Sequence, residues 1–329
     1  MDHISEFSKP CNRPVSDGSS WLILANPEAG HGISDKNLTD IANLFKSNHI
    51  EHEILASESY GQLFDCASTA ADMGYKGVIA YGGDGTASQI AAGIIHGKIR
   101  IPLSILPAGN GNDWARTAGI KTFEDTVESV LGDVRCDMDA AQCVISDTNG
   151  NTFHSSVFIN SAGIGLDAYV LQKALRQRKK ISLGRLGYAF ALISTLLERP
   201  LWEGRMIVDE AEVYSGKYLS LTSGVCPYIG GGMMLSPSSF PFDDMLDTAM
   251  VKPISRTRFI RSVPMLFRGS ILKNHAVISW RSKEFRLEAV GSTRIELDGE
   301  LVSQIPDNAT VILKSIPSAI CVMGAGPNI

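Results

Sequence analysis

At 329 residues, with 44% hydrophobic and 20% charged side chains, the chain has the composition of a globular protein with room for about two domains. Its formal net charge of −5 argues against a nucleic-acid binder that relies on bulk electrostatics. The six scattered cysteines form no CxxC pair, which argues against a zinc site or a dense disulfide framework and fits a reducing cytosol.

The amino-terminal end of the chain is polar. Residues 1–20 lack the apolar core of a signal peptide, and we predict a disordered tail there. The longest apolar stretch, at 186–197, is too short to span a bilayer. We therefore expect a cytoplasmic protein that is soluble, or peripheral to the inner face of the membrane.

Residues 21–132 alternate between short apolar runs and segments whose apolar residues have helical spacing. The apolar runs predict buried strands, and the segments between them predict helices. This alternation at short spacing predicts a doubly wound parallel sheet in an N-terminal α/β domain. Strands are expected at 21–26, 51–56, 76–81 and from 101, and helices at 34–50, 61–74, 86–97, 114–120 and 123–132.

After Gly132 the pattern becomes rich in strands. The Asn149-Gly150 pair lies between strand-like runs at 134–146 and 152–163, and it predicts a β-hairpin. Two helices are expected within 166–197.

The rest of this half predicts a C-terminal domain, from 133 to 329, built as an antiparallel β-rich sandwich or flattened barrel. We place the boundary near Asp133. Further strands are expected at 204–209, 211–223, 248–252, 276–281, 284–290, 293–297 and 310–323.

Two glycine-rich turns follow neighbouring predicted strands, at 82–85 and 109–111, and each lies beside an acid, Asp84 or Asp113. Ligands of parallel sheets bind outside the carboxyl ends of the strands. Glycine lets backbone N–H groups approach an anion, and a following helix N-terminus favours negative charge. Two such turns predict a phosphate site, although each alone is also typical of a tight strand-to-helix turn.

Several common nucleotide motifs do not occur. GIIHGK at 93–98 has the wrong spacing for a Walker A loop, and no protein-kinase HRD or DFG set is present. GIGLDA at 163–168 matches GxGxxA, but it lies in the strand-rich half without a second βαβ unit.

Six short blocks occur in a specific order along the chain: NPEAG at 26–30, GGDGT at 82–86, PAGNGNDWAR at 107–116, GIGLDA at 163–168, GGGMMLSP at 230–237 and LDGE at 297–300. With these blocks the chain resembles the diacylglycerol kinase catalytic-domain family, which includes bacterial soluble lipid kinases and sphingosine kinases. It is more distantly similar to NAD kinases and phosphofructokinases. The resemblance covers residues 21 to about 301.

The resemblance implies an ATP-dependent kinase that phosphorylates a lipid alcohol such as diacylglycerol. It places ATP on the N-terminal domain, and it implies a nucleotide site lined by residues from several of the blocks. These residues are Asn26, Pro27, Gly30, Ser57, Gly82, Gly83, Gly85, Thr86, Gln89, Gly109, Asn110, Gly111, Asn112 and Glu300.

The resemblance also implies two magnesium sites and a general base. Asp84 and Asp113 would help to hold a catalytic Mg²⁺, partly through water. Asp243 would bind a structural Mg²⁺ together with backbone carbonyls such as that of Met245. Asp298 matches the acid proposed as the general base, with Asp84 as its rival. Carboxylate oxygens suit Mg²⁺, and an attacking alcohol must lose its proton.

The sequence departs from the family pattern at four positions. Gln89 replaces a glutamate, Asn110 a threonine, Ser223 an asparagine and Asp244 a glycine. These changes leave room for an altered substrate or a weakened enzyme. Two alternatives therefore stay open: a soluble small-molecule kinase of the NAD kinase type, and a regulator that binds nucleotide or lipid without turnover.

Two basic segments, 174–197 and 255–269, combine cations with apolar residues. Each is typical either of an interfacial element in transient contact with anionic lipid or of a solvated helix beside a core helix. Pro264 is expected to kink or end the second helix. Long exposed strands make a homodimer conceivable.

Overall fold

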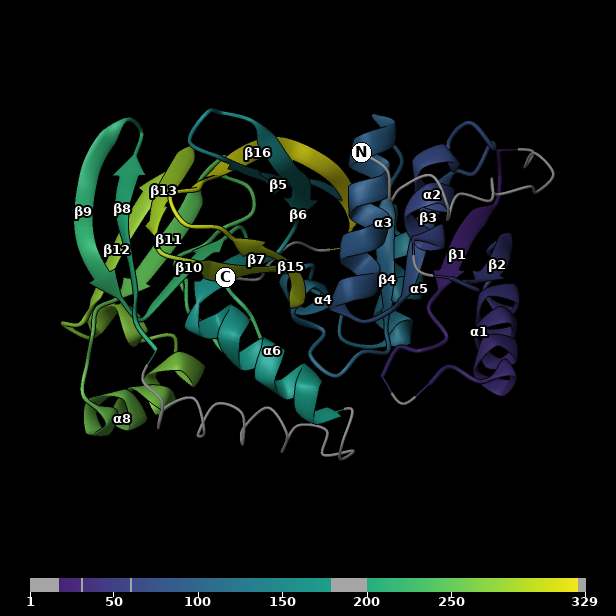
Figure 1. Cartoon of the computed structure of the whole chain (residues 1–329). Helices are drawn as coiled ribbons and strands as arrows, with labels where there is room; N and C mark the ends of the chain where they lie inside the picture. Colours follow the sequence, from purple (N-terminus) through teal and green to yellow (C-terminus); the bar gives the residue numbers. More distant parts are fainter. Residues whose placement is uncertain (1–17, 31, 60, 179–199, 325–329) are drawn as a thin grey trace. The chain divides into compact units, whose positions relative to one another are not determined.

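The computed structural model describes residues 18–30, 32–59, 61–178 and 200–324. Most of the predicted tail, residues 1–17, and the second helix expected before 197 lie outside the described residues. Figure 1 gives the order of the elements along the chain.

The chain forms two compact units. One comprises Met1–Met138 together with Ser318–Ile329, and the other comprises Asp139–Pro317. The boundary predicted near Asp133 cuts the chain once, whereas these units cut it twice. The second cut arises because the last strand, β16 (Thr310–Met323), pairs with a strand of the first unit near its end, at Val322. Such a return leaves no mark in a local sequence pattern.

The first unit contains the predicted parallel sheet, with strand order β2-β1-β3-β4. Trp21, Ile23 and Phe45 are among its core residues. Helices cover both faces of the sheet, and this burial explains why the central strands are unbroken runs of apolar residues. The strands are β1 (Trp21–Ala25), β2 (His52–Ala56), β3 (Gly77–Gly82) and β4 (Leu103–Pro107).

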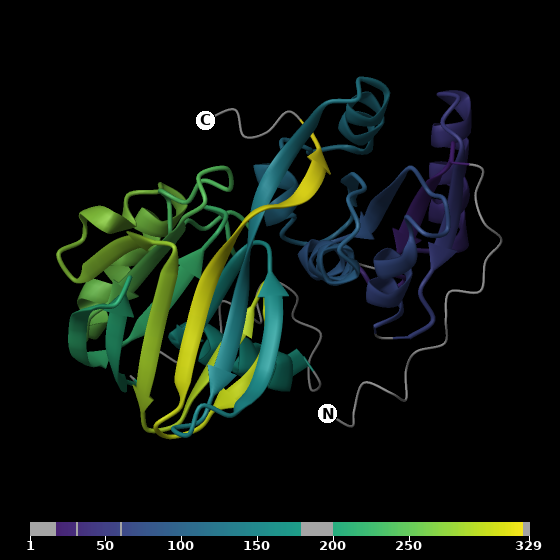
Figure 2. The ribbon, with the colours of Figure 1, turned by 90° about the horizontal axis from the view of Figure 1, so that it is seen from above.

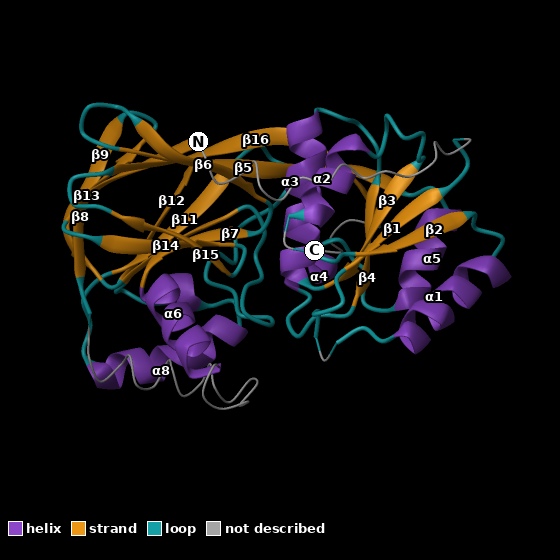
Figure 3. Ribbon diagram, turned by 45° about the vertical axis from the view of Figure 1, so that its right-hand side comes forward, coloured by secondary structure: helices purple, strands orange, loops and turns teal. Residues whose placement is uncertain are grey.

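Helices lie on both faces of this sheet, as the doubly wound prediction requires; in Figure 3, α1 and α5 lie on one face and α2 and α3 on the other. Ser34 and Thr122 begin α1 and α5 with capping boxes, which fix where these helices start. The helices are α1 (Asp35–Ser47), α2 (Gln62–Thr69), α3 (Asp84–Gly97), α4 (Asp113–Thr117) and α5 (Phe123–Leu131).

The second unit contains the predicted sandwich. One sheet is antiparallel, with strand order β12-β11-β10-β7-β14-β15. Its strands are β7 (Ser161–Gly165), β10 (Ser220–Gly224), β11 (Leu246–Val251), β12 (Val277–Ser282), β14 (Thr293–Leu297) and β15 (Glu300–Ile305).

The other sheet of this unit joins β16, β13, β8 and β9, and β5 pairs with both β16 and β6. In Figure 2 the yellow β16 lies between the yellow-green β13 and the teal β5 and β6. The β5–β6 hairpin predicted from Asn149-Gly150 is confirmed. The strands are β5 (Arg135–Ser146), β6 (Thr152–Phe158), β8 (Trp202–Val208), β9 (Ala211–Tyr218) and β13 (Glu284–Val290).

Two strand predictions were wrong in the same way. The run 152–163 is divided between β6 and β7, and the run 211–223 is divided between β9 and β10, so each crosses from one sheet to the other. Strand β15 was not predicted as a separate strand. A strand-like run does not reveal a change of sheet, because the residues on both sides of the crossing are strands, mostly exposed in β6 and β9 and buried in β7 and β10.

Two helices and a short 3₁₀ turn cover part of the antiparallel sheet of the second unit. They are α6 (Leu166–Arg178), α8 (Arg256–Phe267) and η1 (Ile271–Lys273). Pro264 does not end α8, which continues to Phe267. Among the residues that the structure describes, no helix is long and apolar enough to cross a membrane.

Candidate functional site

The two glycine turns of the first unit meet at the carboxyl end of the parallel sheet. A Cβ added to Gly83 would lie 2.9 Å from the Cα of Gly109, and one added to Gly109 would lie even closer to Gly83. A Cβ on Gly30, which follows β1, would strike the carbonyl oxygen of Ala108. Three turns from three adjacent strands therefore touch through bare backbone, and only glycine allows this approach.

Side chains complete this edge of the sheet. Asn26 donates a hydrogen bond from Nδ2 to Oγ1 of Thr86 at 3.2 Å, which joins the turn after β1 to the first turn of α3. Ser57, just after β2, donates its backbone N–H to Ala25 at 2.9 Å. Asn112 adopts a left-handed conformation and holds both backbone groups of Gly109 with its amide.

The two acids of this edge have different surroundings. Asp84 is half-buried at the start of α3, and its Oδ1 accepts the backbone N–H of Trp114 at 2.9 Å. Asp113 is only 2% exposed, and its Oδ1 pairs with the Arg116 guanidinium at 2.5 Å. Asp84 thereby ties the first glycine turn to α4, while Asp113 is held within α4.

The structure brings most predicted nucleotide residues to one edge of the first unit. Gln89 lies in α3, just beyond the first glycine turn. Four other predicted site residues belong instead to the second unit: Asp243, Met245, Asp298 and Glu300. The residues at the edge are Asn26, Pro27, Gly30, Ser57, Gly82, Gly83, Asp84, Gly85, Thr86, Gly109, Asn110, Gly111, Asn112 and Asp113.

Asp298 lies in a two-residue hairpin loop between β14 and β15. Asp298 and Gly299 have φ angles of 51° and 82°, the signature of a type I′ Asp-Gly turn. The Asp298 side chain is nevertheless buried, with the residue only 7% exposed. Its carboxylate accepts the backbone N–H groups of Ile159 at 2.9 Å, Asn160 at 2.8 Å and Ser161 at 3.0 Å. These are the residues where the chain crosses from β6 to β7.

Three backbone donors favour the ionised form of a carboxylate and fix its orientation. Asp298 therefore stabilises the sheet crossing as well as its own turn. This explains why the run 152–163 breaks there, although no feature of that run itself announces the break.

Two more acids lie beside this turn, Glu296 buried and Asp167 half-buried, and no sequence pattern singles them out as a pair. Asp167 and Glu296 both face Gly163; a Cβ there would lie 3.2 Å from Oδ2 of Asp167 and would strike Oε1 of Glu296. Thr222 and Ser220 donate hydroxyls to Asp167 at 2.5 and 3.1 Å. Gly163 is thus required for the two carboxyl groups to face one another across β7.

Burial sets the protonation of this pair. Burial raises the pKa of Glu296 well above its usual range, and the nearby Asp167 carboxylate raises it further. Burial also raises the pKa of Asp167, against the opposing effect of the Thr222 and Ser220 hydroxyls. Two carboxyl groups so placed favour a state in which at least one is protonated.

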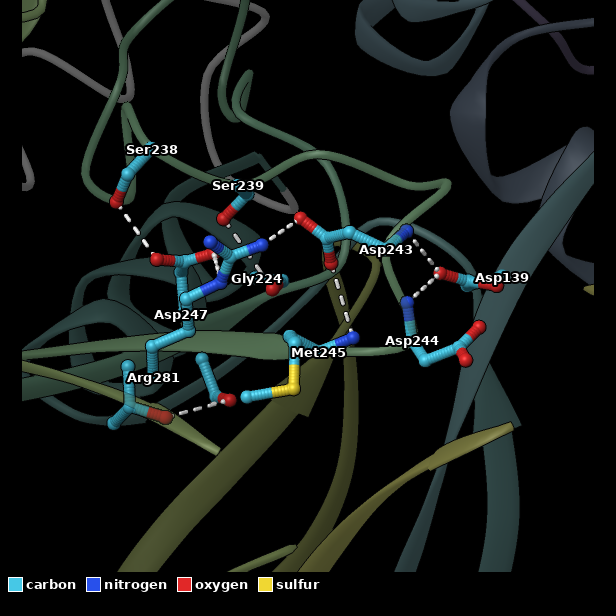
Figure 4. A network of polar contacts seen from close by, with 11 residues as sticks. Asp139, Gly224, Ser238, Ser239, Asp243, Asp244, Met245, Asp247 and Arg281 are labelled. Atoms are coloured by element: carbon cyan, nitrogen blue, oxygen red, sulfur yellow. Dashed lines mark hydrogen bonds and ion pairs between the residues drawn. The ribbon is translucent and has the colours of Figure 1, made fainter. Parts of the chain in front are cut away.

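The predicted structural-metal residues form a polar network in the turn before β11 (Figure 4). Asp243 accepts the backbone N–H of Met245 at 3.0 Å on one oxygen and the Arg281 guanidinium on the other. Nε of Arg281 in β12 also lies 3.9 Å from Oδ2 of Asp247, the residue opposite it in β11. Oδ2 of Asp139 accepts the backbone N–H groups of Asp243 and Asp244 at 3.1 and 2.8 Å.

Asp244, which stands where the family has glycine, takes the left-handed conformation with a φ of 62°. The Asp139 carboxylate holds its N–H, which offsets part of the cost of that conformation. Another departure, Ser223, is buried and accepts a hydroxyl hydrogen bond from Thr248 at 2.9 Å.

The donor atoms decide how well each acid suits Mg²⁺. Asp84 offers a carboxylate next to the glycine turns, which suits a cation that prefers oxygen ligands. Asp113 carries a guanidinium on Oδ1, so it suits an indirect role through water. Both oxygens of Asp243 have partners, and Mg²⁺ would have to displace Arg281. The described geometry of Asp243 therefore fits an ion pair rather than a metal, and the metal there stays a prediction. Within the described ranges, no cluster of three His, Cys, Asp or Glu residues could hold a metal ion.

Sequence reasoning missed Asp139, Asp167, Asp247, Arg281 and Glu296 as members of polar networks. The pairing of Asp247 with Arg281 depends on the register of β11 and β12, which a single sequence does not fix. The sheet that carries Glu296 also had to be known before its burial could be inferred.

A parallel α/β unit with glycine turns at the carboxyl end of its sheet, followed by a β-sandwich, is the arrangement that two family models of lipid kinases describe. The family model for the diacylglycerol kinase catalytic domain matches residues 20–143, and that for the YegS C-terminal NAD kinase beta sandwich-like domain matches residues 160–324. The chain belongs to the diacylglycerol kinase catalytic-domain family, and it is a kinase with an alcohol acceptor.

Relatives of similar length support this assignment. The chain is 29% identical over 307 residues to a diacylglycerol kinase of Mycobacterium tuberculosis (strain ATCC 25618 / H37Rv), which covers 91% of this chain and 93% of the relative. It is 27% identical over 286 residues to a diacylglycerol kinase of Bacillus subtilis (strain 168), covering 86% and 90%.

Solved structures show the same fold. A diacylglycerol kinase from Bacillus anthracis str. Sterne matches with a TM-score of 0.73 at 22% identity, covering 93% of this chain and 97% of that one. Yeast NADH kinase matches with a TM-score of 0.54 at 9% identity, covering 96% and 85%. The second likeness concerns the fold alone.

Proposed function

We propose that the protein is an ATP- and Mg²⁺-dependent lipid kinase. It transfers the γ-phosphate of ATP to a hydroxyl of diacylglycerol or a related lipid, in the cytoplasm and in transient contact with a membrane surface. The observation that carries the proposal is the meeting of Gly30, Gly83 and Gly109 at one edge of the parallel sheet, in a chain of the diacylglycerol kinase family.

Phosphate binding follows from the physics of that edge. The bare backbone of the turns leaves N–H groups accessible to phosphate oxygens. The fourteen-residue helix α3 begins at Asp84, directly after the first turn, and its N-terminus favours a negatively charged group. The bond between Asn26 and Thr86 holds two of the turns in register.

Phosphoryl transfer depends mostly on neutralising and positioning the phosphates. A bound Mg²⁺ supplies that neutralisation; Asp84 would hold it directly, and Asp113 through water. Gln89 keeps a hydrogen-bonding end on α3 but brings no charge, so the carboxylate charge near the phosphates rests mainly on Asp84.

We assign Asp298 as the group that orients the acceptor hydroxyl and accepts its proton. Three N–H donors fix the orientation of its carboxylate. A loose transition state needs little proton removal before the phosphate has largely transferred, so orientation of the alcohol matters more than basicity. Glu300, at the start of β15, would act beside it on the nucleotide.

The test incubates purified protein with labelled ATP and Mg²⁺ in separate arms with diacylglycerol micelles, sphingosine micelles, empty micelles and NAD. We expect labelled lipid from one of the lipid arms, and loss of label with EDTA. Asp84→Asn is expected to lose turnover, and Asp72→Asn, which changes an exposed acid, is expected to retain it.

The other arms distinguish the remaining candidates. Labelled NADP formed without any lipid would identify a small-molecule kinase. Tight ATP binding without transfer to any acceptor, by a folded protein, would identify a regulator and overturn the proposal.

A further inference from the structure

One stretch of the second unit is strongly basic although the whole chain has a net charge of −5. No aspartate or glutamate occurs from 248 to 283, and helix α8 lies in the middle of this stretch. Its cations are Lys252, Arg256, Arg258, Arg261, Arg268, Lys273, Arg281 and Lys283.

The inner side of α8 is firmly attached to the unit. Phe259 packs against a buried cluster that includes Leu166 and Val170 of α6. Ser262 is buried, and its hydroxyl accepts a hydrogen bond from Asn274 at 2.6 Å. In Figure 3, α6 and α8 lie on the same side of the antiparallel sheet.

The outer side of α8 exposes large apolar side chains. Ile260 is 59% exposed and Phe267 is 57% exposed, and Pro264 between them is also exposed. Ideal helix geometry puts these three within an arc of roughly 60°. Arg256 lies at one border of the arc, and Arg261 lies toward the other.

We propose that this outer side of α8, defined by Arg256, Ile260, Arg261, Pro264 and Phe267, docks on the surface of an anionic bilayer. Ile260 and Phe267 enter the boundary between headgroups and acyl chains, and the arginines bind lipid phosphates. The inference rests on the proposed function, because a lipid acceptor has to be reached at a membrane.

The size and charge of the surface favour a bilayer over a protein partner. A stable protein interface buries roughly 800 Å² on each side with a hydrophobic centre. Two large apolar side chains on one narrow arc are too few for that, but they suit shallow insertion. This stretch has eight cations and no acid, and although Arg281 pairs with Asp243 outside it, the excess of cations complements a continuous negative surface without needing a matched pattern of charges.

Vesicle co-sedimentation without ATP tests the surface. The full chain is mixed with phosphatidylcholine vesicles, or with vesicles of phosphatidylcholine and phosphatidylglycerol in equal amounts. We expect binding to the anionic vesicles only. Ile260→Ala/Phe267→Ala and Arg256→Gln/Arg261→Gln should each weaken that binding by about tenfold or more. The arginine variant should also show a weaker salt dependence than the wild type.

Matched controls remove the same chemistry elsewhere. Leu131→Ala/Val290→Ala changes side chains that are 56% and 54% exposed, and Arg100→Gln/Arg135→Gln removes two exposed charges from the first unit. Both should bind vesicles as the wild type does. Equal binding by the α8 variants and the wild type, equal losses in the controls, or no vesicle binding at all would overturn the inference.

A kinase assay separates this result from the fate of the proposed function. The α8 variants should phosphorylate a short-chain diacylglycerol in free solution as the wild type does, and lose turnover only on acceptor embedded in anionic vesicles. Vesicle binding through α8 without any kinase activity would reject the proposed function and retain the docking surface. Kinase activity together with vesicle binding that the α8 substitutions do not change would reject the docking surface and retain the proposed function.

Discussion

Each unit of this protein has a glycine next to an aspartate in a turn that ends a strand, Gly83 before Asp84 and Gly299 after Asp298, and the two turns use glycine for different reasons. In the first unit the glycines before Asp84 have no positive φ, but Gly83 leaves no space for a Cβ against Gly109. In the second unit Gly299 has a φ of 82° and nothing within 4 Å of an added Cβ. The first turn needs glycine for space, and the second needs it for backbone conformation.

The aspartates of the two turns also have different surroundings. Asp84 is half-buried and has a backbone hydrogen bond to Trp114, whereas Asp298 is buried and holds three backbone N–H groups. Identical dipeptides can therefore begin a helix or hold a sheet crossing. What distinguishes them is the burial of the carboxylate, which is half-buried at Asp84 and buried at Asp298.

The largest expected effect comes from replacing each of the two aspartates separately with asparagine. We predict that Asp84→Asn and Asp298→Asn each lower turnover by about 10²–10⁴-fold. Only Asp298→Asn should also lower the free energy of unfolding, by about 1–3 kcal/mol, because an amide cannot accept all three N–H groups equally well. Turnover on a lipid acceptor and urea unfolding measure the two effects.

Asp72→Asn serves as the control, since this acid is exposed and should affect neither quantity. Equal destabilisation by Asp84→Asn and Asp298→Asn would contradict the contrast between the two turns. Wild-type turnover in Asp298→Asn would remove it from the reaction and leave Asp84 as the candidate base.

The second prediction tests the need for space in the first unit. Gly109→Ala places a Cβ against the backbone of Gly83, which cannot move aside as a flexible side chain could. We expect a loss of about 1–3 kcal/mol in the free energy of unfolding and a weaker affinity for ATP. Thermal unfolding and nucleotide titration by calorimetry measure the two.

Gly150→Ala is a suitable comparison for ATP affinity, because an added Cβ there has nothing within 4 Å and its φ of 81° makes backbone conformation its only cost. Unchanged ATP affinity in a folded Gly109→Ala protein would show that the meeting of the two turns is not needed for the nucleotide.

The sequence was sufficient for the parts of the fold that depend on local periodicity. The parallel sheet of the first unit and the Asn149-Gly150 hairpin were predicted correctly from apolar runs and turn residues. The crossing at Ile159–Ser161 was not, because a carboxylate from Asp298, more than a hundred residues later in the chain, holds it.

The residues of the candidate site also fall into two groups, those that a local pattern reveals and those that only the fold brings together. The glycine turns and their acids were recognisable because they follow strands directly in the sequence. The facing of Asp167 and Glu296 across Gly163 depends on the packing of α6 on β7 and β14, and no local pattern encodes that packing. Register and burial had to be known first.

The third prediction concerns the buried acid next to the second turn. Burial raises the pKa of Glu296 well above 4.5, so the folded protein retains a proton that the unfolded chain releases. The stability contributed by that proton is complete below the unfolded pKa and is lost as pH rises toward the folded pKa. In this window the free energy of unfolding should fall by about 1.4 kcal/mol per pH unit.

Glu296→Gln cannot ionise, so its stability relative to the wild type should increase with pH across the window, while its amide oxygen can still accept the Gly299 N–H. Urea unfolding at a series of pH values gives the difference. Glu128→Gln, which changes an exposed acid, should follow the wild type. Parallel pH profiles of Glu296→Gln and the wild type would show that Glu296 is already ionised in the folded protein.

The smallest expected effect returns to the second turn itself. Gly299→Ala meets no steric barrier, so its only cost is the left-handed conformation, about 1–2 kcal/mol for a residue with a Cβ. Gly299→Asn should cost less, because asparagine tolerates this conformation better than alanine. The order of stability, glycine above asparagine above alanine, would be measured by thermal unfolding. The same pair of substitutions at Gly109 should show no advantage for asparagine, since there the larger side chain meets backbone and conformation is not the constraint. Rescue by asparagine at Gly299 but not at Gly109 is therefore the outcome that separates a glycine needed for its φ from one needed for its size.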